Sequence, residues 1–213
     1  MSPDTALPTF PIERGSALAQ AVLPSSRPVS LETPAIEVMT DLTQVKATKD
    51  LNELLADPSI DLIDLCVPTP THVKLATLAL RAGKHVVCEK PLAMNLEQGA
   101  EMVSSAKKSG VHLFYAEQLV FAPRYQKIKE LIAQNTFGQL VHISHRERHG
   151  GPHAKWFRDP AMSGGGVTMD MGIHGIGLIQ WLLKPAKITH VYARILTLDK
   201  SSQVDDHCLI TLE

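Results

Sequence analysis

The fold class of this chain is decided by residues 60–91, IDLIDLCVPTPTHVKLATLALRAGKHVVCEKP. The apolar run at 60–67 is typical of a strand that is covered on both faces of a parallel sheet. Apolar side chains then recur at helical spacing over 73–82, and Gly83 stands where a left-handed helix cap belongs. Residues 85–89 predict the next strand. Strand, helix and strand in this order indicate a doubly wound parallel sheet.

The same alternation continues on both sides of this stretch. Asn95 is a good helix cap, Gly110 ends the helix that follows it, and Pro58 closes a short helix before the first strand. The remaining predicted elements are helices at 49–56, 95–108, 123–135 and 166–183, and strands at 111–116, 140–148, 188–197 and 207–212.

Residues 1–36 differ in composition from the rest of the chain. Six prolines interrupt every candidate element there, and no G-x-G-x-x-G motif is present. We therefore predict an irregular segment at 1–36, a partial dinucleotide-binding domain at 37–118 and a partial substrate and oligomerisation domain at 119–213. Because the sequence stops inside the last predicted strand, we expect the second domain to be truncated.

Composition narrows the class of partner. The 21 basic and 22 acidic residues nearly cancel, so no field of one sign is available to attract nucleic acid or an anionic membrane. No apolar run approaches the roughly 20 residues that span a bilayer, and no signal peptide is visible. The three cysteines Cys66, Cys88 and Cys208 suit buried thiols in a reducing compartment. We expect a cytoplasmic protein with a small-molecule partner.

Two loops at predicted strand ends are candidate ligand sites, because ligands bind at the carboxyl ends of parallel strands. The loop at 68–72 offers rigid backbone, two hydroxyls and an imidazole for a cofactor, or is simply a stiff turn with a capping threonine. At the next strand end, Lys90 either pairs with Glu89 or is held toward a substrate oxygen, where its cation stabilises developing alkoxide charge.

Asp170 and His174 are four residues apart on a predicted helix, so they share a face. The carboxylate can orient the imidazole, which titrates near neutrality and can accept a hydroxyl proton. The alternative is a polar pair that only stabilises a buried helix. Gly164, Gly165 and Gly166 precede this pair and predict free amide donors for an anionic or oxygen-rich ligand at the helix start.

Four histidines, at 142, 145, 149 and 153, suggest a metal site at first sight. His142 and His145 would face opposite sides of a strand, and His149 and His153 lie in a loop without a cysteine or carboxylate pattern, so we expect no metal. His149 and His153 could instead hydrogen-bond substrate hydroxyls, with Trp156 offering an apolar face to a sugar or cyclitol ring.

From about residue 37 the chain resembles the glucose-fructose oxidoreductase and inositol dehydrogenase family, often called Gfo/Idh/MocA. The resemblance rests on the order and spacing of Leu54–Pro58, Ala82–Val86, Glu89–Ala93 and the stretch from Gly164 to His174. It implies an incomplete Rossmann-like, doubly wound parallel sheet followed by a partial α/β domain with an open, mostly antiparallel sheet.

The resemblance also implies chemistry. Members transfer a hydride between NAD or NADP and a hydroxyl carbon of sugars or cyclitols, and they often form oligomers. Carried over, the catalytic residues are Lys90, Asp170 and His174; the cofactor contacts are Pro68, Thr69, Thr71, His72, Glu89 and Lys90; and the substrate contacts are Gln118, Arg124, His149, Trp156, Asp170 and His174.

Residues 1–36 depart from the family pattern, since the glycine-rich turn that cradles the pyrophosphate has no counterpart there. Two hypotheses therefore stand after the sequence alone. The first is an NAD(P)-dependent dehydrogenase of a sugar or cyclitol, which we expect to form a homo-oligomer. The second is a non-catalytic fragment or pseudoenzyme of the same family that binds a polyol or serves in oligomer contacts.

Overall fold

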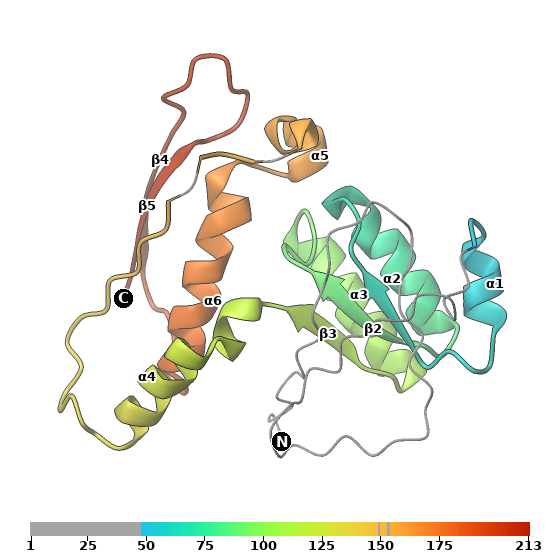
Figure 1. Cartoon of the computed structure of the whole chain (residues 1–213), viewed down its shortest axis with the longest axis horizontal. Coiled ribbons are helices and arrows are strands. Elements are labelled where there is room, and N and C mark those ends of the chain that lie inside the picture. The colour runs from blue at the N-terminus through green and yellow to red at the C-terminus, as the bar shows by residue number, and fades with distance from the viewer. Residues whose placement is uncertain (1–47, 149, 153) are drawn as a thin grey trace. The chain divides into compact units, whose positions relative to one another are not determined.

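The computed structural model describes residues 48–148, 150–152 and 154–213 and divides them into two compact units (Figure 1). Unit 1 contains the described residues up to Val67, together with Thr71–Leu92 and Leu96–Ala116. Unit 2 contains Pro68–Pro70, Ala93–Asn95 and Glu117–Glu213. The predicted irregular segment at 1–36 and the candidate residue His149 lie outside the described residues.

Unit 1 is built on a parallel sheet, as the sequence predicts. Its strands are β1 (Leu62–Leu65), β2 (His85–Glu89) and β3 (Leu113–Ala116), in the order β1-β2-β3. The register pairs Leu62 with His85 and Val86 with Leu113. The helices of this unit are α1 (Leu51–Ala56), α2 (His72–Arg81) and α3 (Leu96–Ser109).

The core of unit 1 forms between the sheet and its helices (Figure 1). The side chains with no measurable exposure are Ala76, Ala79, Leu80, Val86, Cys88 and Met102. The central strand β2 is buried along its middle because neighbours and helices cover it, which explains its continuous apolar sequence. Cys66 is exposed, so the prediction of buried thiols holds for Cys88 and is wrong for Cys66.

Local capping signals set the helix ends in unit 1. Asp50 accepts a hydrogen bond from the amide of Asn52 and begins α1. Gly83 and Gly110 follow α2 and α3 with φ of 79° and 68°, in the left-handed region where a side chain is strained. Both glycines occupy the positions that the sequence predicts for them.

Unit 2 combines helices with an antiparallel strand pair. Its regular elements are η3 (Gln118–Phe121), α4 (Pro123–Ala133), η4 (Lys155–Arg158), α5 (Pro160–Ser163), η5 (Thr168–Gly172), α6 (Ile173–Leu182), β4 (Val191–Leu196) and β5 (His207–Leu212). β4 and β5 pair antiparallel, with Val191 opposite Leu212 and Leu196 opposite His207. The prediction of a second, antiparallel sheet is confirmed.

Two local predictions for unit 2 are wrong. Residues 140–148 alternate in polarity yet form no strand, because alternation becomes a strand only where a hydrogen-bonded partner lies alongside, and the described sheet of this unit contains β4 and β5 alone. The single helix predicted at 166–183 begins instead with η5, a π-helical turn, which leads into α6.

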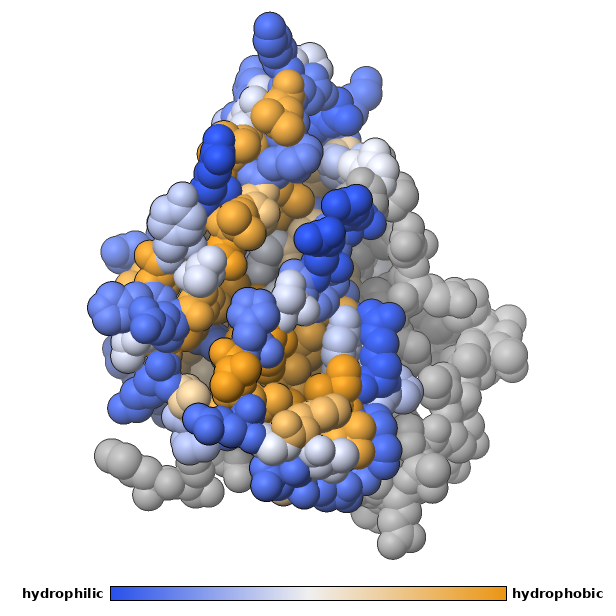
Figure 2. All heavy atoms as spheres, turned by 90° about the vertical axis from the view of Figure 1, so that its left-hand side faces the viewer, coloured by the Kyte–Doolittle hydropathy of each residue, from blue (hydrophilic) through white to orange (hydrophobic). Residues whose placement is uncertain are grey.

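Large apolar side chains are exposed on β4 and β5. Among them Val191, Tyr192, Ile195 and Leu209 are each more than half exposed. Figure 2, which views the molecule from the side on which these strands are labelled in Figure 1, shows hydrophobic residues interspersed with hydrophilic ones. None of the described helices combines the length and apolarity needed to cross a membrane.

Candidate functional site

The carboxyl ends of β1, β2 and β3 carry the polar residues that the sequence singles out. The parallel arrangement brings these ends to one edge of the sheet, where ligands bind in open α/β folds. β1 leads through η2 (Thr69–Thr71) into α2, β2 ends in Glu89 and is followed by Lys90, and β3 is followed by Glu117.

His72 holds two of these loops together. Its imidazole is 1% exposed, with Nε2 2.8 Å from the carbonyl oxygen of Val67 and Nδ1 3.1 Å from that of Pro91. The ring therefore links the segment after β1 to the segment after β2. Both ring nitrogens therefore face carbonyl oxygens of the main chain, and the cofactor contact expected of His72 stays a prediction.

Glu89 and Lys90 interact through the main chain. The carboxylate of Glu89 accepts a hydrogen bond of 3.0 Å from the backbone amide of Lys90. This contact anchors the backbone directly after β2, and the side chain of Lys90 is half-buried. The catalytic role of Lys90 stays a prediction.

Glu117 begins η3 and is among the most buried charged residues of the described chain. It is 4% exposed, and its side chain accepts a hydrogen bond from the amide of Leu119 at 3.2 Å. A Cβ added at Gly177 would lie 3.4 Å from Cγ of Glu117. Gly177 of α6 therefore lies next to this side chain, at a distance that an added methyl group would meet as an ordinary van der Waals contact.

His174 lies on α6 against this carboxylate. Its Nδ1 is 2.8 Å from Oε1 and 2.9 Å from Oε2 of Glu117, and the imidazole is 4% exposed. Buried charges in proteins are retained where they are paired and hydrogen-bonded, and here each residue supplies the other's partner. The structure thus joins a predicted site residue to a second residue 57 positions away.

Sequence reasoning missed Glu117, although a signal was present. Glu117 directly follows an apolar strand, as Glu89 ends the preceding one, and it is adjacent to Gln118, a predicted substrate contact. The residue expected to orient His174 was Asp170, on grounds of helical spacing. The carboxylate that the structure places on Nδ1 is Glu117, and Asp170 lies in the π-helical turn that precedes α6. The role of Asp170 stays a prediction.

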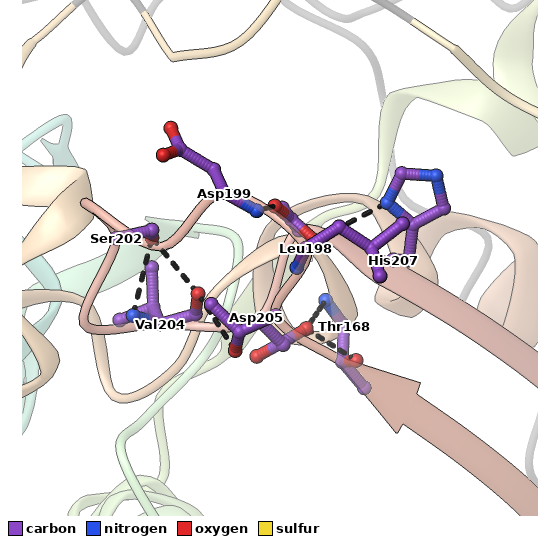
Figure 3. A network of polar contacts seen from close by, with 9 residues as sticks. Thr168, Leu198, Asp199, Ser202, Val204, Asp205 and His207 are labelled. Atoms are coloured by element: carbon purple, nitrogen blue, oxygen red, sulfur yellow. Dashed lines mark hydrogen bonds and ion pairs between the residues drawn. The ribbon is translucent and has the colours of Figure 1, made fainter.

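The glycine triplet is enclosed by Asp205. The carboxylate of Asp205 accepts a hydrogen bond of 2.7 Å from the amide of Gly166. It also accepts hydrogen bonds from the amide of Thr168 at 2.7 Å and from the Thr168 hydroxyl at 2.6 Å (Figure 3). A Cβ on Gly166 would overlap the backbone of Asp205. The prediction that these amides are free to bind a ligand is therefore wrong. The glycine does allow another group to approach the backbone closely, but that group is Asp205 of the same chain.

The predicted substrate contacts in unit 2 lie on separate elements. Gln118 is exposed on η3, Arg124 on α4 stacks over the ring of Tyr125 at 4.6 Å, and Trp156 on η4 stacks on Phe157 with ring centroids 3.8 Å apart. Stacking on Phe157 covers one face of the Trp156 ring. The roles of these three residues stay predictions.

A second histidine–glutamate pair lies beside α6. Nε2 of His145 is 3.1 Å from Oε1 of Glu147, and the ring of His145 would be 3.2 Å from a Cβ added at Gly175. Both side chains are more exposed than those of His174 and Glu117. Among the described residues, no three histidine, cysteine or acidic side chains group as metal ligands.

Comparison with known families now adds to this geometry. Residues 16–117 match the family model described as "Oxidoreductase family, NAD-binding Rossmann fold", and residues 125–213 match the GFO/IDH/MocA C-terminal domain. The chain belongs to the GFO/IDH/MocA oxidoreductase family. The resemblance inferred from the sequence is confirmed, and so is the Rossmann-like fold of unit 1.

Individual family members show the extent of the similarity. The chain is 31% identical over 77% of its length to the uncharacterized oxidoreductase YrbE of Bacillus subtilis, covering 47% of that protein. It is 33% identical over 69% of its length to myo-inositol 2-dehydrogenase of Thermotoga maritima, covering 43% of that protein. The chain thus spans about half the length of the curated relatives it matches.

A solved structure of the family supports the same conclusion. GenD2 from gentamicin A biosynthesis, in complex with NAD, is 30% identical with a TM-score of 0.73. The alignment covers 79% of this chain and 48% of GenD2. This GFO/IDH/MocA chain therefore shares the fold of a family member that binds NAD.

Proposed function

We propose that this chain works as an NAD(P)-dependent oxidoreductase that transfers a hydride between nicotinamide and a hydroxyl carbon of a sugar or cyclitol. The observation that carries the proposal is the imidazole of His174, 4% exposed and held through Nδ1 by a carboxylate. Family membership and similarity to a myo-inositol dehydrogenase support the substrate class.

The residues divide the work as follows. His174 takes the proton when the substrate O–H bond breaks, and the ammonium of Lys90 stabilises negative charge on that oxygen as the carbonyl forms. Asp170 is a further carboxylate close to His174 in sequence. When bound, NAD or NADP supplies the acceptor for the hydride that leaves the same carbon.

The described residues fit part of a dinucleotide site. Polar groups follow the carboxyl ends of β1 and β2, and we assign Pro68, Thr69, Thr71, Glu89 and Lys90 as cofactor contacts. In the described part of unit 1 no glycine-rich turn connects a strand to a helix, so a pyrophosphate cradle is not among these residues. The substrate contacts assigned in unit 2 are Gln118, Arg124, Trp156, Asp170 and His174.

An absorbance assay tests the proposal. The purified chain is incubated with NAD or NADP and with myo-inositol or simple aldoses, and reduced nicotinamide is followed with time. We expect substrate-dependent reduction, lowered roughly 10²- to 10⁴-fold in His174→Asn, the range of general acid–base catalysis. Equal rates in the two proteins would remove His174 from the mechanism.

A second candidate function is suggested by the exposed apolar residues of β4 and β5. Val191, Ile195 and Leu209 form part of a surface that suits a non-catalytic role in oligomer contacts. Sedimentation of the chain and of Ile195→Lys tests it: a larger assembly that the lysine dissociates, together with absent turnover, would favour this function over catalysis.

A further inference from the structure

The contact between Glu117 and His174 allows an inference about protonation. A carboxylate accepts hydrogen bonds and cannot donate one, so a nitrogen 2.8–2.9 Å from both its oxygens must carry the proton. In the neutral ring the other nitrogen, Nε2, then holds the lone pair. Proton exchange with a bound substrate would then take place at Nε2.

The surroundings keep the carboxylate in this position. The amide of Leu119 donates a hydrogen bond to Oε1, and Gly177 of α6 lies beside Cγ and Cδ of Glu117. Glu117 and His174 are both 4% exposed, so bulk water does not compete for the hydrogen bond. A hydrogen bond at one ring nitrogen sets the role of the other.

We propose that Glu117 is a positioning residue that holds His174 in the Nδ1–H tautomer and presents Nε2 for proton exchange with the substrate hydroxyl. This inference rests on the proposed function and deepens it. Glu117 acts through His174. It orients the ring, and its charge stabilises the imidazolium that forms when the hydroxyl proton is taken up.

Other charged groups on the neighbouring elements have to be considered in any test by pH. Asp170 lies on η5, His145 and Glu147 lie beside Gly175, and Lys129 of α4 contacts Trp181, its Nζ 3.9 Å from the ring centroid. Both carboxylate oxygens of Glu117 lie within hydrogen-bond distance of His174 Nδ1. Glu147 provides a matched control, since it pairs with a histidine beside the same helix.

The first experiment measures the tautomer without any need for activity. Long-range ¹H–¹⁵N correlation spectra of the ¹⁵N-histidine-labelled full chain, assigned with His174→Asn, report which ring nitrogen is protonated. We expect His174 to be Nδ1–H above neutral pH. An Nε2–H tautomer in the wild-type chain would overturn the proposal even if the enzyme is fully active.

The second experiment measures the consequence for catalysis. Glu117→Gln keeps an acceptor oxygen and removes the charge, so we expect kcat to fall about 10- to 100-fold with KM within threefold, and the acidic limb of the kcat/KM profile to move to lower pH. Glu147→Gln should leave both unchanged. An unaltered kcat and acidic limb in Glu117→Gln would refute the positioning role.

The two experiments separate the possible failures. If the wild-type chain reduces no cofactor, the proposed function fails, while the spectra still decide whether Glu117 sets the tautomer. If Glu117→Gln does not fold, Glu117→Asp takes its place in the assay, with the shorter side chain lowering kcat through lost ring orientation. The wild-type spectrum remains decisive in both cases.

Discussion

The carboxylate of Asp205 bridges the amides of Gly166 and Thr168, with one oxygen 2.7 Å from each nitrogen. The backbone carbonyl of Asp205 also accepts the amide of Val167 at 2.8 Å. Asp205 thus accepts hydrogen bonds from three successive backbone amides at the start of the π-helical turn η5, which leads into α6 and His174. We call this set of hydrogen bonds the Asp205 clasp. The glycine triplet contributes to the clasp, whereas the proposed acid–base residue, His174, lies further along on α6.

Removing the clasp should destabilise the start of η5. Asp205→Ala leaves two amides and the Thr168 hydroxyl without their acceptor, and hydrogen bonds to a charged group are worth about 1.5–3 kcal/mol each. We expect a loss of about 2–4 kcal/mol in unfolding free energy. Hydrogen exchange at the amides of Gly166 and Thr168 should speed up, and Lys200→Ala in the same exposed loop should change neither quantity.

Alanine substitutions at three glycines should change the unfolding free energy to different degrees. Gly166→Ala should be the most damaging, because its Cβ overlaps the backbone of Asp205, which cannot rotate away. Gly165→Ala meets Cγ of the flexible Met169 at 2.7 Å and should cost less. Gly99→Ala on α3 meets nothing within 4 Å and should stabilise by about 0.5–1 kcal/mol. Chemical denaturation of the three variants measures this order, and a Gly166→Ala protein as stable as wild type would contradict it.

The stability of unit 1 should fall through His85 as the pH drops below about 6.5. Burial, and then the neighbouring His112, lower the pKa of His85 from 6.5, while Asp61 opposes them. Because the folded pKa lies below the unfolded one, the unfolded chain takes up the proton first, and stability is lost as the pH falls below about 6.5. Protonation also removes the acceptor for the His112 amide, 2.9 Å from Nδ1.

His85→Gln checks the histidine prediction, since its amide oxygen can still accept from His112. We expect the unfolding free energy of this variant to depend less steeply on pH below about 6.5. Equal slopes for the two proteins would assign the acid sensitivity to another group.

The ionisation of Asp64 should have the opposite effect on the pH dependence of stability to that of His85. Burial, and next the charge of Glu89, raise its pKa above 3.8, with a hydrogen bond from Cys66 acting against them. Since the folded pKa exceeds the unfolded one, stability is lost as the pH rises through this range. Asp64→Asn should therefore stabilise unit 1 at pH 7, with the gain shrinking toward pH 4. A gain that is independent of pH would point to packing instead of charge.

Much of the fold could be predicted because its signals are local. The strand at 85–89 has the predicted bounds, and Gly83 and Gly110 cap their helices as expected, since cap geometry depends on residues within one turn. Two predictions from local patterns were wrong. Residues 140–148 alternate in polarity but have no partner strand among the described residues, and the helix predicted from residue 166 begins with the π-helical turn η5.

For the candidate site, the sequence could predict which types of residue take part but not which of them lie in contact. The sequence by itself determined the alternation of strands and helices in unit 1, the polar residues at strand ends and the presence of His174 on a helix. Only the tertiary structure decided that Glu117 holds His174 from 57 residues away and that Asp205 closes the glycine turn from 39 residues away. The physical reason is that helical and strand periodicity act over a few residues, whereas the partner of a buried polar group is chosen by how distant elements pack.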